Sequence, residues 1–125
     1  MDQNQLRTLE QQCVQEQPPY CVAACPIHVD GRGLCHCVAG GDWDGAWKVL
    51  RKTMPLPGVL ARICTAPCRD KCLRAKAGDP VEISLLEQAV VSQPAPVQRF
   101  MPLPGKDAAI AVLGSGLSGL TLAWD

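Results

Sequence analysis

Cysteine content constrains this chain more than any other feature of its sequence. The chain has eight cysteines in 125 residues, and six of them form two groups, Cys13, Cys21, Cys25 and Cys64, Cys68, Cys72. Secreted proteins use such cysteines for disulfides, whereas cytosolic proteins use them to bind metal. The first residues lack the basic start and apolar run of a signal peptide. We therefore expect a cytoplasmic protein that binds metal through reduced thiols.

The spacing within the two groups narrows the choice of metal. Cys25 is followed by a proline, and the second group has two successive gaps of three residues. Thiolates are soft ligands that suit zinc or iron–sulfur clusters. Structural zinc sites also use four Cys or His ligands at short gaps. The spacing favours iron–sulfur clusters and leaves two alternatives open, a zinc-stabilised docking module and a disulfide-stapled interaction domain.

Composition and charge exclude several function classes. With 47% hydrophobic and 19% charged residues, the chain is expected to be globular. Its formal net charge is zero, which gives no reason to propose nucleic acid as a partner. No apolar run approaches the roughly 20 residues that span a bilayer. Eight basic residues lie between positions 48 and 76; they form either solvated helix faces or a positive surface that offsets clusters or docks a partner.

Hydrophobic periodicity predicts a mainly helical first domain. Helices are expected at residues 3–13, from Asp30 onward, at 42–53 and at 82–92, with a loop at 54–58. The clearest begins after Asp42, a natural N-cap, and carries Trp43, Ala46, Trp47 and Leu50 on one face. Those tryptophans are interpreted as core residues.

A change of composition predicts a boundary after the helical part. Residues 93–106 are rich in proline and form a linker between domain 1–92 and segment 107–125. The apolar run 108–113 is typical of a buried parallel strand, and Gly114, Ser115, Gly116 and Gly119 belong to a glycine motif that opens a helix reaching Trp124. This context predicts the first strand, turn and helix of a truncated Rossmann-type α/β domain that binds a dinucleotide.

The chain resembles a known family over nearly its whole length. The similarity rests on the two cysteine groups, on short motifs at 41–46, 55–57 and 80–83, and on the glycine motif, all in the family's order. The family is the N-terminal iron–sulfur domain of the glutamate synthase small subunit, dihydropyrimidine dehydrogenase and related FAD-dependent NAD(P)H oxidoreductases. The resemblance implies a helical ferredoxin-like domain with two [4Fe–4S] clusters.

The resemblance also implies which residues bind each cluster. The first cluster would use Cys13, position 16, Cys21 and Cys72, and the second would use Cys25, Cys64, Cys68 and Glu87. Position 16 departs from the family, because Glu16 stands where the second cysteine belongs. We expect the Glu16 carboxylate to fill the fourth coordination position; the alternatives are a cluster with three cysteines and one open iron, or no first cluster.

The chemistry of Glu87 supports its role independently. Glu87 lies in an apolar stripe of its predicted helix, where an unpaired carboxylate is costly. The alternative is a capping box from Ser84 to Glu87, with the helix starting later. Cys35 and Cys37 are expected to be packing residues, because residues two apart on a helix point to nearly opposite faces. His28 and His36 are expected to be structural.

The function implied by the resemblance is electron transfer. FAD would take a hydride from NAD(P)H, and the clusters would relay single electrons between the flavin and a partner subunit or second site. No residue of this chain is expected to be catalytic.

Overall fold

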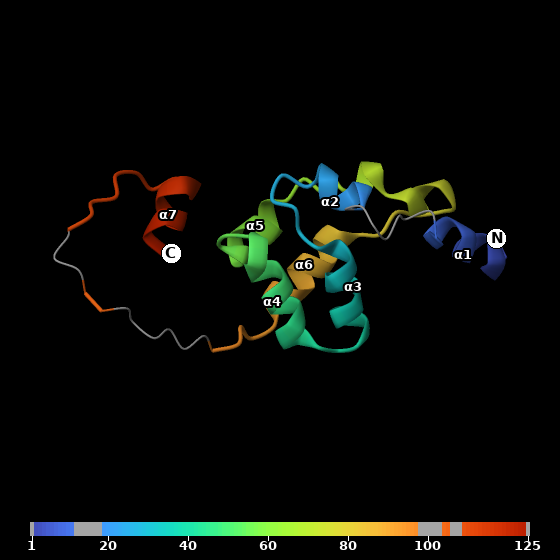
Figure 1. Cartoon of the computed structure of the whole chain (residues 1–125), viewed down its shortest axis with the longest axis horizontal. Helices are drawn as coiled ribbons and strands as arrows, with labels where there is room; N and C mark the ends of the chain where they lie inside the picture. Colours follow the sequence, from blue (N-terminus) through green and yellow to red (C-terminus); the bar gives the residue numbers. More distant parts are fainter. Residues whose placement is uncertain (1, 12–18, 98–103, 106–108, 125) are drawn as a thin grey trace. The chain divides into compact units, whose positions relative to one another are not determined.

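A computed structural model describes residues 2–11, 19–97, 104–105 and 109–124 of the chain. The chain divides into two compact units, Met1–Ala95 and Pro96–Asp125, and each is described by itself. The predicted domain limits at 92 and 107 stay a prediction. Within the described ranges the structure is helical and contains no strand (Figure 1).

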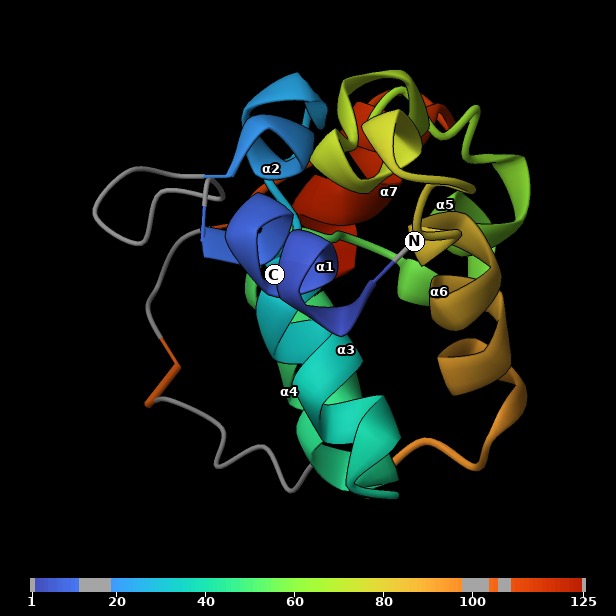
Figure 2. The same ribbon diagram turned by 90° about the vertical axis from the view of Figure 1, so that its right-hand side faces the viewer.

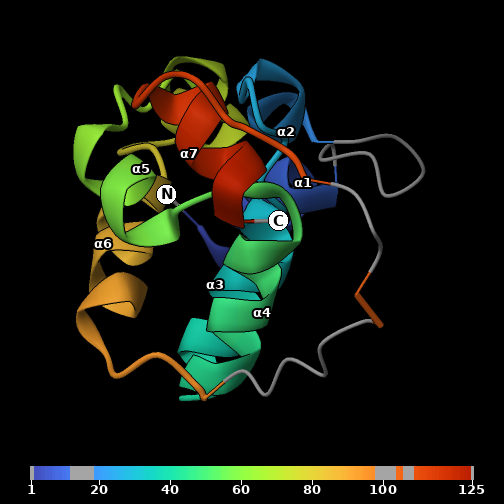
Figure 3. The same cartoon turned by 90° about the vertical axis from the view of Figure 1, so that its left-hand side faces the viewer.

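The first unit consists of short helices joined by tight turns. Its elements are α1 (Gln3–Gln11), α2 (Tyr20–Ala24), α3 (Gly31–Ala39), α4 (Trp43–Thr53), α5 (Pro57–Ile63), the 3₁₀ turns η1 (Arg69–Lys71) and η2 (Leu73–Lys76), and α6 (Ile83–Ser92). Helices α3 and α4 lie side by side, and α6 packs against α3, α4 and α5 (Figures 2 and 3).

Helix α4 confirms the predicted helix at 42–53. The Asp42 carboxylate accepts the backbone N–H of Gly45 at 2.8 Å and so caps the first turn. Ala46, Trp47 and Leu50 are buried, as their spacing predicts. The prediction is wrong for Trp43, whose side chain is 36% exposed. Trp43 is the first residue of the helix and precedes the stretch that packs against the core.

Helix α3 also has an aspartate N-cap and a buried face, and it forms one wall of the candidate site. Asp30 caps it by accepting the N–H of Gly33 at 3.0 Å. Leu34 is fully buried on the core side. Gly31 is buried against α6, and a Cβ atom there would stand 3.3 Å from Cδ1 of Ile83. The missing side chain therefore lets the first turn of α3 approach the first turn of α6 closely.

The core beneath the site is small and apolar. Its buried residues come from the segment before α3 and from α3 to α6, and are Val29, Leu34, Ala46, Trp47, Leu50, Met54, Ala61, Cys68, Ile83 and Val90. On the surface of α4, the guanidinium of Arg51 lies 4.9 Å from the ring centre of Trp47, which covers part of that ring. No described helix is long and apolar enough to cross a membrane.

Three details of the first unit differ from the sequence predictions. Helix α5 begins at Pro57, inside the predicted loop 54–58, because proline suits the first helical position, where its missing N–H costs nothing. Helix α2 and the two 3₁₀ turns were not predicted, because elements of three to five residues are too short for a periodic pattern. The predicted end of the first helix, at position 13, lies outside the described residues.

In the second unit the predicted helix is confirmed and the predicted strand is wrong. Helix α7 spans Leu117–Trp124 after the glycine motif. Residues 109–113 are extended and mostly exposed, with Ile110 86% and Leu113 97% accessible. A strand needs a neighbour to satisfy its backbone groups and cover its side chains, and the described part of this unit offers none.

Candidate metal centre

The structure brings together the four residues expected to bind the second cluster. Cys25 follows α2, Cys64 and Cys68 flank the turn after α5, and Glu87 lies in α6. The Cys64 thiol donates a hydrogen bond to the Glu87 carboxylate, and the charge of Cys25 acts on both Cys64 and Cys68. Residues more than 60 positions apart in the sequence therefore lie in one neighbourhood, although no three of their side chains stand close enough to hold a single metal ion.

Glu87 is buried, and one of its carboxylate oxygens has no hydrogen-bond partner. Its side chain is 3% exposed, and Oε2 has no hydrogen-bond partner. Burial raises the pKa of Glu87 above its ordinary value, although the Cys64 hydrogen bond lowers it. Ser84 and Glu87 both lie inside α6, which begins at Ile83, and the N-cap Glu82 makes no side-chain cap hydrogen bond. The capping-box alternative is therefore wrong.

Electrostatics in this group favour a positive centre. Burial, together with the charges of Cys64, Glu87, Cys25 and Cys21, raises the pKa of Cys68 to about 11. Burial also raises the pKa of Cys64, with Glu87 and Cys25 adding to the shift and the Ala66 N–H opposing it. Each anion makes its neighbours harder to ionise, so this donor set loses its protons together only around a cation. Three thiolates and a buried carboxylate with an orphaned oxygen fit an iron–sulfur cluster.

The turn between Cys64 and Cys68 directs a backbone N–H at sulfur. Ala66 adopts the left-handed conformation, with φ of 54°, and its N–H lies 3.4 Å from Sγ of Cys64. A left-handed alanine costs about 1 kcal/mol. The N–H of Val81 similarly lies 3.5 Å from Sγ of Cys72. Hydrogen bonds to sulfur are among the features by which proteins adjust cluster potentials.

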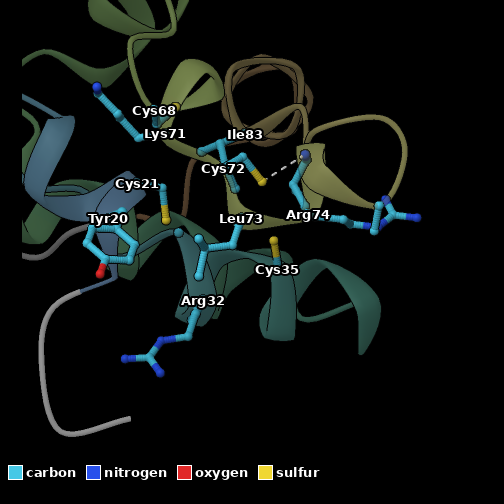
Figure 4. Close-up of a pocket in the computed structure, with 13 residues that line it drawn as sticks. Tyr20, Cys21, Arg32, Cys35, Cys68, Lys71, Cys72, Leu73, Arg74 and Ile83 are labelled. Atoms are coloured by element: carbon cyan, nitrogen blue, oxygen red, sulfur yellow. Dashed lines mark hydrogen bonds between the residues drawn. The ribbon is translucent and has the colours of Figure 1, made fainter. Parts of the chain in front are cut away.

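A second group of cysteines surrounds a cavity whose wall includes Cys68 of the first group. The cavity has a volume of about 290 Å³ and is lined by Cys21 of α2, Cys35 of α3, Cys68, and Cys72 between the two 3₁₀ turns. Figure 4 shows the sulfurs of Cys21, Cys35 and Cys72 directed into the same space. Cys21 and Cys72 were predicted to bind the first cluster. Cys13 and Glu16, the other two predicted donors, lie outside the described residues.

Cys35 packs against the core as predicted and, in addition, lines this cavity, which the sequence predictions did not anticipate. It was assigned to packing because Cys35 and Cys37 cannot share a metal, and Cys37 is indeed absent from the cavity wall. Cys35 packs partly against the core and also faces the cavity. Burial raises the pKa of Cys35, and the nearby Cys21 and Cys72 add to the shift. The signal that could have found it is its place one helical turn after the buried Gly31.

Cations line the same cavity. Arg32, Lys71 and Arg74 contribute to its wall, together with apolar side chains such as Leu73, Val81 and Ile83. Other members of the basic stretch have different roles, since Arg69 pairs with Glu82 at 3.1 Å on the surface. Lys71 and Arg74 are exposed, and Figure 4 shows their charged ends directed away from the cysteine sulfurs, so the basic residues between 48 and 76 that line the cavity do so with the rest of the residue.

The remaining candidate residues have simpler roles. His28 is structural, because its Nδ1–H donates to the carbonyl oxygen of Val22 at 3.0 Å. His36 is exposed on α3. Among the described side chains, no three of Cys, His, Asp or Glu stand close enough to hold one metal ion. The cysteines at the 290 Å³ cavity are therefore spread around a volume and do not converge on a point.

The glycine motif adopts a tight turn before α7. Gly114 has φ of 119°, and a Cβ atom on Gly119 would stand 2.2 Å from the carbonyl oxygen of Gly114. Only glycine at both positions permits this approach. Ser115 and Gly116 complete the exposed turn.

The helical fold and the two cysteine-rich groups define a small iron–sulfur domain. The family described as dihydropyrimidine dehydrogenase domain II, 4Fe-4S cluster, matches residues 1–97. The chain belongs to this family, as the resemblance predicted. No solved structure matches the chain.

Its relatives are subunits of oxidoreductases. The chain is 30% identical over 109 residues to the NADPH-Fe(3+) oxidoreductase subunit beta of Geobacter sulfurreducens, covering 83% of this chain and 16% of that protein. It is 27% identical to the NAD-dependent dihydropyrimidine dehydrogenase subunit PreT of Escherichia coli, covering 80% and 25%. It is 29% identical to the glutamate synthase [NADPH] small chain of Bacillus subtilis, covering 81% and 21%. The chain thus spans a quarter or less of each of these relatives.

Proposed function

We propose that this chain carries two [4Fe–4S] clusters and relays single electrons between a flavin and a partner site of an NAD(P)H oxidoreductase. The observation that carries the proposal is the buried group of Cys25, Cys64, Cys68 and Glu87, in which one carboxylate oxygen has no partner. Membership of a 4Fe–4S domain family supports the same reading.

Each cluster has its own proposed ligand set. The second cluster is bound by Cys25, Cys64, Cys68 and Glu87. The first is bound by Cys13, Cys21 and Cys72, with Glu16 as the fourth donor that the sequence predicts. The clusters supply one-electron chemistry when bound, and the protein would adjust their potential through ligand type and the N–H donors to sulfur.

The second unit is proposed to open a Rossmann-type domain that binds FAD. The close approach of Gly119 to Gly114 supports this, because a dinucleotide turn needs glycine where the backbone nears the pyrophosphate. In this proposal NAD(P)H is the electron donor, the partner is an acceptor or donor subunit, and the protein acts in the cytoplasm. The NADPH- and NAD-dependent names of the relatives support the choice of substrate.

The test is the metal content of the protein purified without oxygen from its own host. We expect brown protein with iron and acid-labile sulfide, and less of both in Cys64→Ser. Cys37→Ser is the matched control, because Cys37 faces neither group of ligands. Stoichiometric zinc without sulfide would refute electron transfer and favour the docking module.

A further inference from the structure

Four exposed cations surround the cysteine-lined cavity and an adjoining hollow. Arg32 and Arg74 line the cavity, Lys76 lines the hollow, and Lys71 lines both. All four residues are exposed, and Figure 4 shows the charged ends of Arg32, Lys71 and Arg74 directed away from the cysteine sulfurs. These four residues, called here the basic rim, therefore present their charges to solvent, where a partner can reach them.

The basic rim is not neutralised by the described part of the chain. Asp70 is the one carboxylate among the described residues that line the cavity and the hollow. No ion pair joins a rim residue to another described residue, whereas the neighbouring Arg69 pairs with Glu82 at 3.1 Å. Four positive charges beside one negative charge leave a local positive excess. Such a patch steers an oppositely charged surface into an encounter.

The basic rim lies beside two proposed ligands of the first cluster. Cys21 and Cys72 line the cavity, and Cys72 also lines the adjoining hollow. Cys72 lies between η1 and η2, the two turns that carry three of the four rim residues. A partner docked at the basic rim would therefore stand next to a proposed cluster ligand, where the path for an electron is short.

The surface between the cations favours a protein as the occupant. Tyr20 lines both the cavity and the hollow and is 59% exposed, and the half-buried Leu73 also lines both. Tyrosine with an apolar neighbour is typical of protein–protein interfaces. Nucleic acid is disfavoured because it is held through roughly 6–10 phosphate contacts. A membrane surface is disfavoured because η1 and η2 have three and four residues, which is too short for an amphipathic helix.

We propose that the basic rim docks an acidic protein surface, rich in aspartate and glutamate, whose owner exchanges single electrons with the first cluster. In each exchange one electron passes between the cluster and the redox group of the partner, and no bond forms or breaks. The inference rests on the proposed function, since it names the chemistry of the electron-transfer partner and the place where it binds.

The first experiment measures the binding of a fluorescein-labelled polyglutamate peptide to the metal-free 125-residue chain by fluorescence anisotropy at low salt. The test variant carries Lys71→Glu and Lys76→Glu. The matched control carries Lys48→Glu and Lys52→Glu, which change the net charge equally at exposed positions of α4 that line neither the cavity nor the hollow. We expect the test variant to bind about 10-fold more weakly than the wild type, and the control to bind within about twofold of it.

The second experiment measures electron transfer from the reconstituted, dithionite-reduced protein by stopped-flow absorbance. Ferricyanide and hexaammineruthenium(III) each accept one electron and carry opposite charges. The test variant should react about 10-fold more slowly than the wild type with ferricyanide and faster than the wild type with the ruthenium complex. Both effects should shrink as added salt screens the charges. The control variant should follow the wild type with both acceptors.

The outcomes separate the inference from the proposed function. Equal weakening of peptide binding in the test and control variants would overturn the inference, because only the charge of the whole chain would then matter. Tighter binding of a DNA duplex or of phosphatidylserine vesicles than of polyglutamate, lost in the test variant, would also overturn it. Wild-type protein without iron and sulfide would refute the proposed function and the electron exchange, whereas the peptide still decides whether the rim docks an acidic surface. Unchanged far-ultraviolet circular dichroism shows that a variant is folded.

Discussion

Replacing Glu87 by leucine should have opposite effects on the metal-free and cluster-loaded protein. In the metal-free protein the carboxylate is 3% exposed and its Oε2 has no partner. An unsatisfied buried acceptor costs about 1–3 kcal/mol, and a charged one costs more. The hydrogen bond from Cys64 offsets only part of this cost, because the pKa of Glu87 remains raised by burial. We therefore expect Glu87→Leu to stabilise the metal-free protein at pH 7 by about 1–3 kcal/mol.

The pH dependence provides a second measure of the same group. Since the folded pKa of Glu87 lies above its ordinary value of 4.5, the stability linked to this proton is fully present below pH 4.5. It is lost as the pH rises through the folded pKa. The stability difference between variant and wild type should therefore grow as the pH rises from 4.5 and then become constant. Urea unfolding followed by circular dichroism at a series of pH values measures this difference.

When the clusters are bound, Glu87→Leu should be unfavourable instead of favourable. Glu87→Leu removes a proposed ligand, so the reconstituted variant should hold less iron than the wild type and lose it faster to a chelator. Gln88→Leu is the matched control, because it adds the same apolar group to a half-buried neighbouring position of α6. A metal-free Glu87→Leu protein that is less stable than the wild type, or a difference that does not change with pH, would refute the reasoning.

Three further predictions concern other parts of the chain. Asp42→Ala should destabilise the protein by about 1 kcal/mol because α4 loses its N-cap, and unchanged urea unfolding would contradict this. In the metal-free protein at pH 8, iodoacetamide should react about 100-fold more slowly with Cys68 than with an ordinary thiol, because burial and the neighbouring anionic groups raise the pKa of Cys68 from 9.0 to about 11. Peptide mass spectrometry measures the rates, and equal rates would contradict this. The 125-residue chain should bind no FAD, because residues 109–113 pair with no strand in its described part; flavin fluorescence in the purified protein would contradict this.

Much of the first unit could be predicted because its signals are local. Asp30 and Asp42 cap their helices as their positions suggest, and the spacing of Ala46, Trp47 and Leu50 identifies a buried face. The exposure of Trp43 could not be predicted. Periodicity identifies which face of a helix is apolar, but it does not tell how far along the helix neighbouring elements cover that face. The strand predicted at 108–113 is wrong over its described residues 109–113 for a related reason, since a strand depends on partners that its own residues do not encode.

In the candidate site, too, features with local signals could be predicted and features that depend on distant segments could not. Glu87 could be identified as unusual from its own helix, because the apolar residues around it share its face. The position of Cys35 at the cavity could not be predicted in this way, because that cavity is also formed by α2 and by the turn at Cys72. Sequence spacing compares Cys35 with Cys37, its neighbour in the chain, whereas the fold places it beside residues 21 and 72.

The meeting of α2 and η1 has a consequence for oxygen tolerance. In the proposed function, a cluster held by Cys25 and Cys64 would act as a crosslink that closes a loop of about 40 residues, and the chain-entropy treatment of such a link gives about 4 kcal/mol of stabilisation. A disulfide of equal span would survive air, but an iron–sulfur crosslink is broken by oxidation. Exposure to oxygen would then release the segments before α3 and after α5 from each other, so that damage to the cofactor also marks the chain for proteolysis.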